Sequence, residues 1–378
     1  MSRSRKSAPL DLFAACAPGL EPLLAAEIPL IAPKARSLQI LPGGVLLHGT
    51  AKTIMRLNLC SGLANRVLLR VGKFNATKLP QLRHKIAELP WKQLLGGRSV
   101  WQVRATSKKS RLYHTGAIAE RVDEAIGKCV GRKQGASPSD GLLVLVRFTD
   151  NICEISLDTS GEPLHKRGWR QQTGKAPLRE DLARALLVTS GWDRQAPLVD
   201  PMMGAGTIVI EAALMAANMA PGLNRSFAFE QTALHDDKMW QRVRADAVTA
   251  QVDPKDVKIL GRDRLDGALK AALGNAKRAG VTDWLALEKA DLRDTALPQA
   301  TAWVTTNPPY GIRLDEADGA LKALGRRFAA LNKGASIALV QPAKTQLHSL
   351  PGSHVGLQPA LMTDHGGTKV VLLQGQAR

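Results

Sequence analysis

Asn307, Pro308 and Tyr310 stand close together in the stretch "TTNPPYG", which continues the apolar run "TAWV" of a buried strand. Proline lacks a backbone N–H and fixes φ, so the two prolines end the strand and hold their backbone stiffly at its carboxyl end. Ligands of open α/β sheets bind at that edge. The pattern indicates a ligand site, although a rigid strand exit with Tyr310 as a packing residue would also produce it.

A glycine turn in "LVDPMMGAGT", residues 198–207, provides a second group of candidates. Glycines between a strand and a helix let a ligand approach the backbone, and the helix start offers free N–H groups. A dinucleotide site would read G-x-G-x-x-G with an acid about 20 residues later, and this turn has neither feature. NAD is therefore the weaker hypothesis. S-adenosylmethionine, with an amino-acid head and a ribose, fits better, and the residues expected to contact it here are Asp200, Met202, Gly204, Gly206 and Thr207.

Two further acids follow apolar strands. Asp263 ends "ILGRD", where a carboxylate could accept hydrogen bonds from ribose hydroxyls, although capping of the next helix is nearly as good an explanation. Asp291 ends "EKAD", where it could accept from an adenine amino group or could be a turn residue. Three acids and Asn307 at four successive strand ends predict one crevice, and Asn307 is also among the residues expected to contact the cofactor there.

The elements that must position these residues alternate along the second half of the chain. Strand patterns at "APLVD", "VKILGRD", "WLALEKAD", "TAWVTTN" and "SIALVQP" are separated by helical patterns, one of which ends at Gly280, and "TKVVLLQG" closes the series. This alternation predicts an α/β fold with a mostly parallel, Rossmann-like sheet and a closing antiparallel strand. The first half mixes short strands and helices, which predicts α+β modules.

The charge distribution indicates a polyanionic partner. The formal net charge is +19, of which residues 1–170 carry +15 and the other 208 residues +4. A basic domain of this strength repels itself without a partner, which favours nucleic acid over a merely solvated basic face.

Cysteine usage and hydropathy exclude other classes of protein. The four cysteines, Cys16, Cys60, Cys129 and Cys153, form no C-x-x-C pair, so we expect neither a zinc site nor a disulfide framework. No run of 18 apolar residues and no secretory signal is evident, so we expect a cytoplasmic protein with no membrane contact.

With these motifs in place, the chain resembles the THUMP-domain class I RNA methyltransferases, especially the bacterial 23S rRNA guanine-N2 methyltransferases. The resemblance spans nearly the whole length. Its motifs are "CAPGLEPLLAAEI", "NLCSGLANRVLLRVGKF", "LHKRGWR", "APLRE", "DPMMGAGTIVIEAA", "APGLNRSFAFE" and "NPPYG". The turn departs from relatives at Met203 and Ala205, where they often carry Cys and Ser, which leaves the glycines intact.

The resemblance implies a division into four parts. These are an N-terminal ferredoxin-like part at residues 1–60, a THUMP-like RNA-binding domain at 61–160, a linker at 161–180 and a methyltransferase domain at 181–378, which would bind S-adenosylmethionine.

The resemblance also implies a chemistry for Asn307 and Pro308, which would accept the two hydrogens of an exocyclic amino group. Tyr310 would stack the extruded base. The implied enzyme is an RNA guanine-N2 methyltransferase acting on structured RNA, with rRNA favoured over tRNA.

Other functions stay open at this point. A tRNA guanine-N2 methyltransferase and an adenine-N6 methyltransferase on RNA or DNA share the motif, and an RNA-binding protein with an inert methylase fold would share the charge. The pattern does not define the target nucleotide, the oligomeric state or the basic residues that contact RNA.

Overall fold

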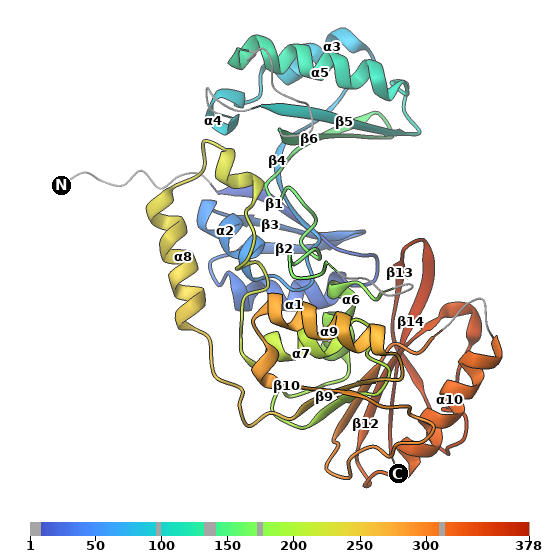
Figure 1. Cartoon of the computed structure of the whole chain (residues 1–378). Helices are drawn as coiled ribbons and strands as arrows, with labels where there is room; N and C mark the ends of the chain where they lie inside the picture. Colours follow the sequence, from blue (N-terminus) through green and yellow to red (C-terminus); the bar gives the residue numbers. More distant parts are fainter. Residues whose placement is uncertain (1–8, 96–99, 132–140, 172–176, 310–313, 378) are drawn as a thin grey trace. The chain divides into compact units, whose positions relative to one another are not determined.

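The computed structural model describes residues 9–95, 100–131, 141–171, 177–309 and 314–377. The chain forms two compact units (Figure 1). The N-terminal unit contains Leu24–Leu164, Arg225–Ala245 and the chain up to Cys16, and the C-terminal unit contains the other residues.

The N-terminal unit contains one sheet of seven strands in the order β2-β3-β1-β4-β7-β6-β5. Only β5 and β6 pair in parallel. The strands are β1 (Leu10–Ala15), β2 (Arg36–Leu41), β3 (Gly44–Gly49), β4 (Arg66–Asn75), β5 (Trp101–Lys108), β6 (Leu142–Thr149) and β7 (Ile152–Asp158). The expected ferredoxin-like and THUMP-like parts therefore share one sheet through the pairing of β1 with β4.

Helices cover this sheet, with α3 and α5 lying over one face of β5 and β6 (Figure 1). Buried positions three and four apart, such as Ile118, Val122 and Ile126 in α5, give that helix its apolar face. The helices are α1 (Glu21–Ile31), α2 (Ala51–Cys60), α3 (Leu79–Ala87), α4 (Trp91–Leu95) and α5 (Thr115–Val130).

The C-terminal unit contains a second sheet of seven strands in the order β10-β9-β8-β11-β12-β14-β13. The first five strands are parallel, and β14 pairs antiparallel with both β12 and β13. They are β8 (Leu198–Asp200), β9 (Ile259–Asp263), β10 (Leu285–Lys289), β11 (Trp303–Thr306), β12 (Ser336–Pro342), β13 (Gln358–His365) and β14 (Thr368–Gln376). The predicted fold class, a mostly parallel Rossmann-like sheet beside an α+β N-terminal module, is confirmed.

The helices of this unit lie between the strands in the chain. They are α6 (Glu180–Thr189), α7 (Thr207–Ala216), α8 (Asp237–Thr249), which starts in the N-terminal unit, α9 (Asp266–Ala279) and α10 (Leu314–Ala329). Short 3-10 turns occur at η2 (Ala228–Gln231), η3 (Thr282–Trp284) and η4 (Ala343–Thr345). Gly280 caps α9 in the left-handed region at φ +72°, as the sequence predicts.

The core of the C-terminal unit lies between α10 and the central strands. Leu324 and Phe328 of α10 are fully buried, and they belong to the same apolar cluster as Val304 of β11 and Leu339 of β12. This packing fixes the end of β11, where Asn307 follows.

The strand order creates a switch point between β8 and β11. From β8 the chain adds β9 and β10 on one side, and it then returns to the other side of β8 with β11. The loops leaving β8 and β11 consequently turn in opposite directions, and open α/β sheets bind their ligands at such a crevice.

Candidate active site

Asp200 and Thr306 join the two strands at the switch point. The Thr306 hydroxyl donates to Asp200 Oδ1 at 2.7 Å, and the backbone N–H of Met202 donates to the same oxygen at 3.1 Å. Asp200 is only 1% exposed. Burial raises the pKa of its carboxyl to about 7, against the two hydrogen bonds, which lower it, and with a small further rise from the charge of Asp263.

The turn after β8 depends on its two glycines. Gly204 has φ +54° and Gly206 has φ +83°, both in the left-handed region. Gly206 precedes the first residue of α7, Thr207, and no side chain caps that helix start. The first N–H groups of α7 are therefore open to a ligand. Met202 is half-buried beside them.

Asp263, the last residue of β9, holds this turn in place. Its Oδ2 accepts the N–H of Gly204 at 3.0 Å, and its Oδ1 accepts the N–H of Leu265 at 3.0 Å. The side chain is half-buried, and each carboxylate oxygen keeps a second lone pair. Asp263 does not cap α9, because the N-cap of that helix is Leu265 and no described side chain caps it. The carboxylate supports the turn instead and can still accept from a ligand.

Asp291 lies two residues beyond β10 and is bound by its own neighbour. The Arg293 guanidinium donates to both carboxylate oxygens, with Nε at 3.0 and 3.1 Å, and the Arg293 N–H donates at 2.9 Å. The hydrogen bond from Arg293 lowers the pKa of Asp291 to about 2. Its contacts are those of a turn residue, and its side chain is 22% exposed.

Asn307 follows β11 directly, and its acceptor oxygen has no partner. Oδ1 is buried and accepts no hydrogen bond within the part of the chain that the structure describes. Pro308 is buried and Pro309 is exposed. Buried acceptors without a partner are uncommon, so the arrangement favours a donor supplied from outside the chain. Tyr310 lies outside the described residues.

Two residues that the sequence did not single out support the turn. Arg170, in the "LHKRGWR" stretch, donates from Nη2 to the Thr207 hydroxyl at 2.8 Å and from Nε to Glu180 at 2.8 Å. Asn275 of α9 donates to the carbonyl of Ala205 at 3.0 Å. The resemblance marked Arg170 only as part of a linker, and nothing in the sequence marks Asn275 inside a regular amphipathic helix.

Hydrogen bonds thus involve most of the predicted residues. Three separate sets of hydrogen bonds hold the turn, one at Asp200, one between Gly204 and Asp263 and one at Thr207, and Asn307 follows Thr306, which bonds to Asp200. The bonds of Asp291, in contrast, stay within its own loop.

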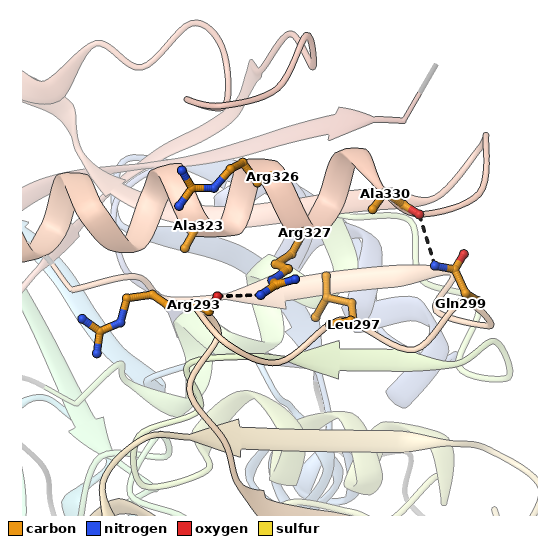
Figure 2. Close-up of a pocket in the computed structure, with 8 residues that line it drawn as sticks. Arg293, Leu297, Gln299, Ala323, Arg326, Arg327 and Ala330 are labelled. Carbon is orange, nitrogen blue, oxygen red and sulfur yellow. Dashed lines mark hydrogen bonds between the residues drawn. The ribbon is translucent and has the colours of Figure 1, made fainter.

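A cavity of about 330 Å³ lies elsewhere in the C-terminal unit, between α10 and the loop after β10 (Figure 2). Arg327 crosses it to donate to the carbonyl of Arg293 at 2.5 Å, and Gln299 donates to the carbonyl of Ala330 at 3.2 Å. None of the predicted site residues that the structure describes lines this cavity.

Within the described residues, no group of three or more His, Cys, Asp or Glu side chains could hold a metal ion. No described helix is long and apolar enough to cross a membrane.

Comparisons with known proteins agree with this geometry. A family model described as "RMKL-like, methyltransferase domain" matches residues 167–352, and one described as "RlmL ferredoxin-like domain" matches residues 11–68. A "Ribosomal RNA large subunit methyltransferase K/L" of Syntrophotalea carbinolica is 35% identical over 331 residues, which are 82% of this chain and 46% of that protein. The chain spans less than half the length of the curated relatives it matches.

Two solved structures cover nearly the whole chain. A putative methyltransferase complexed with SAH is 30% identical, has a TM-score of 0.85 and covers 98% of both chains. A predicted N6-adenine-specific DNA methylase of Listeria monocytogenes is 28% identical, has a TM-score of 0.86 and covers 97% of this chain and 96% of its own.

Proposed function

This chain belongs to the RMKL-like methyltransferase family, and on that premise we propose that it transfers a methyl group from S-adenosylmethionine to the exocyclic N2 of a guanine in 23S rRNA. The observation that carries the proposal is Asn307 Oδ1, a buried acceptor without a described partner at the end of β11. Asn307 Oδ1 needs a hydrogen-bond donor, and an amino group with two hydrogens can supply one.

The residues around the turn fit the cofactor. Gly204 and Gly206 bring backbone close to a ligand, and the uncapped start of α7 at Thr207 suits its carboxylate. The free lone pairs of Asp263 suit ribose hydroxyls. Bound there, S-adenosylmethionine supplies an electrophilic methyl group on a sulfonium sulfur.

Asp200, Met202 and Asp291 complete the proposed set of cofactor-binding residues, and their contacts suit that role to different degrees. Asp200 is buried within the switch point and is suited to orienting the turn, while Met202 offers half-buried apolar surface. Asp291 would have to share its carboxylate between Arg293 and an adenine amino group.

The chemistry proposed for Asn307 and Pro308 is to make a poor nucleophile reactive. The lone pair of an exocyclic amino nitrogen is delocalised into the base. When Asn307 Oδ1 and the Pro308 carbonyl accept its two hydrogens, the nitrogen is drawn toward a tetrahedral shape and its lone pair is oriented for attack. The nitrogen would gain the methyl group as the carbon–sulfur bond of the cofactor breaks, which leaves S-adenosylhomocysteine. The nitrogen would then release one proton to water, because alkylation makes it acidic. In this scheme Tyr310 stacks the extruded base.

RNA is the proposed partner, through the basic first half of the chain. The net charge of +15 on residues 1–170 supports this assignment, together with a division into parts at 1–60, 61–160, 161–180 and 181–378. The similarity to a ribosomal RNA methyltransferase of Syntrophotalea carbinolica favours rRNA over tRNA. The cytoplasmic location stays a prediction.

An adenine-N6 methyltransferase is the second candidate. The Asn-Pro-Pro-Tyr motif permits either base, and the similar Listeria protein is described as a predicted N6-adenine-specific DNA methylase. The basic N-terminal half favours an RNA substrate.

A single-turnover assay with labelled cofactor and rRNA tests the proposal. Asn307→Ala should raise the barrier to methyl transfer by about 2 to 4 kcal/mol, because it removes one positioned acceptor, and should leave cofactor affinity nearly unchanged. Asn332→Ala is the matched control, because Asn332 is an exposed asparagine whose side chain donates to the Gln299 carbonyl at 3.2 Å, away from the predicted site.

Chromatography of the product nucleosides completes the test. We expect N2-methylguanosine. An Asn307→Ala protein with the wild-type rate would remove the motif from the mechanism, and N6-methyladenosine would keep the mechanism while replacing the substrate.

A further inference from the structure

The N-terminal sheet has an uncovered face at its β5 edge. Side chains alternate along β5, so that Trp101, Val103 and Ala105 point toward the helices while Arg104 and Lys108 are exposed on the opposite face. The register of β5 with β6 aligns Thr106 with Arg147, which is also exposed.

This face is rich in unpaired positive charge. The side chains of Arg104 and Arg147 make no ion pair or hydrogen bond within the described part of the chain. The acid in the same row, Glu154, lies opposite Arg147 in the register but pairs with Lys73 at 3.2 Å and with Arg70 at 3.7 Å. The free guanidinium groups therefore point from a rigid sheet into solvent.

The loop that follows β5 is held against the neighbouring turn between β6 and β7. The N–H of Arg111 donates to Asn151 Oδ1 at 2.8 Å, and the N–H of Asn151 donates to Ser110 Oγ at 2.9 Å. The N–H of Asp150 donates to the carbonyl of Lys108 at 3.2 Å. These bonds fix the loop in one conformation at the end of the basic face.

Tyr113 projects from this loop. The chain has only two tyrosines, and one of them, Tyr113, is 67% exposed. Its ring lies 4.1 Å from the His114 ring, centroid to centroid, at an angle of 39°. This exposed aromatic pair gains little from burial, and it lies beside Lys108, Lys109 and Arg111.

We propose that this basic face and the Tyr113 loop form a binding surface for single-stranded RNA, in which Arg104 and Arg147 contact phosphates and Tyr113 stacks an unpaired base. Phosphates alone would need only the cations, whereas an exposed aromatic ring beside them suits a base with a free face. Bases inside a duplex offer no such face, which selects single strands or loops. The inference rests on the proposed function only in taking RNA as the partner.

Fluorescence anisotropy of the full-length protein with a short labelled oligouridylate tests the surface without cofactor. Tyr113→Ala should weaken binding about tenfold, and Tyr113→Phe should keep it within about twofold, because phenylalanine retains the stacking face. Arg147→Ala should lower the slope of log K against log salt by about 0.7, the value for one phosphate on a single strand.

Lys34→Ala is the charge-matched control, since Lys34 is exposed in the same unit but lies before β2, at the other end of the sheet. It should leave the slope unchanged. Equal slopes for Arg147→Ala and Lys34→Ala would overturn the phosphate contact, and wild-type affinity in Tyr113→Ala would overturn the stacking contact. A Tyr113→Ala loss of the same size on blunt duplex RNA would also overturn stacking.

The outcomes separate this surface from the proposed function. A wild-type protein that binds no oligouridylate overturns the surface, whereas the methyl-transfer assay on rRNA decides the function independently. If Tyr113→Ala and Arg147→Ala bind oligouridylate as the wild type does, and the protein still methylates rRNA, the proposed surface is wrong and the proposed function stands.

Discussion

Asp200 combines complete burial with a carboxyl group that favours the protonated form. Because its folded pKa is raised from 3.8 to about 7, the folded protein binds this proton more tightly than the unfolded chain. Its contribution to stability therefore falls as the pH rises from about 4 to about 7. The loss amounts to roughly 4 kcal/mol if the full shift is realised.

Asp200→Asn should remove this pH dependence, because an amide oxygen can accept from Thr306 and Met202 without a charge. We expect urea unfolding to show the variant more stable than wild type at about pH 8, with a smaller difference at about pH 5. A difference that does not change with pH would mean that Asp200 is already ionised in the folded protein at the lower pH.

Asp263 gives a prediction about the cofactor. Asp263→Ala frees the N–H of Gly204 and removes the proposed ribose acceptor, so cofactor affinity should fall by about 1 to 3 kcal/mol in titration calorimetry. The control is Asp266→Ala, which removes an equal charge from a largely exposed side chain nearby that pairs with Lys289 at 2.7 Å. Equal losses from the two variants would assign the effect to charge alone.

At the scale of elements, the two glycines of the turn differ in their surroundings. A Cβ on Gly206 would lie 3.0 Å from Cβ of Ala272 in α9, whereas a Cβ on Gly204 would meet nothing within 4 Å. Both positions require a positive φ, which costs a non-glycine residue about 1 to 2 kcal/mol.

Gly204→Ala should therefore cost only the backbone strain, and Gly206→Ala should lose at least about 1 kcal/mol more, because α7 and α9 must separate. Chemical unfolding of the two variants measures the difference. Equal losses would show that α9 adjusts to the added methyl group without cost.

The sequence predicts elements well where periodicity and burial agree. The five parallel strands, α7 and the end of α9 at Gly280 have such patterns. It missed β13 because that strand pairs only with β14, exposes Met362 (57% exposed) and contains a register shift after Pro359, so no alternation is visible. The structure therefore has the predicted antiparallel strand, β14, and adds β13 at the edge beyond it.

The candidate site was also predictable in part: the residues at strand ends could be predicted from the sequence, and their tertiary partners could not. Acids and glycines at strand ends are visible in a sequence, since strand ends carry their own pattern. The partners Arg170 and Asn275 depend on tertiary contacts with Thr207 and Ala205, which no local spacing encodes. The pairing of Asp291 with Arg293 is local, two residues along the chain, and it agrees with the turn role that the sequence also allowed.

At the scale of the whole molecule, the N-terminal unit is built from segments that are not contiguous in the sequence. Residues Arg225–Ala245 return to the N-terminal unit after the chain has begun the C-terminal one. The N–H of Phe229 donates to the carbonyl of Thr159 at 2.9 Å, and the N–H of Ala233 donates to that of Leu94 at 2.9 Å. A fragment that ends near residue 170 would lack these contacts, so RNA binding is better measured on the full chain.

Phe229 is the residue with which to test this returning segment. Its side chain is 2% exposed, and its ring packs edge-on against Trp240 with centroids 5.0 Å apart. Phe229→Ala should destabilise the N-terminal unit by about 3 to 5 kcal/mol, as expected for a large buried ring, whereas Phe229→Leu should cost less because it keeps most of the apolar volume. Hydrogen exchange should then rise in β7, next to Thr159, while cofactor affinity in the C-terminal unit stays unchanged. Full protection in β7 combined with a loss of cofactor affinity would instead assign the returning segment to the methyltransferase unit.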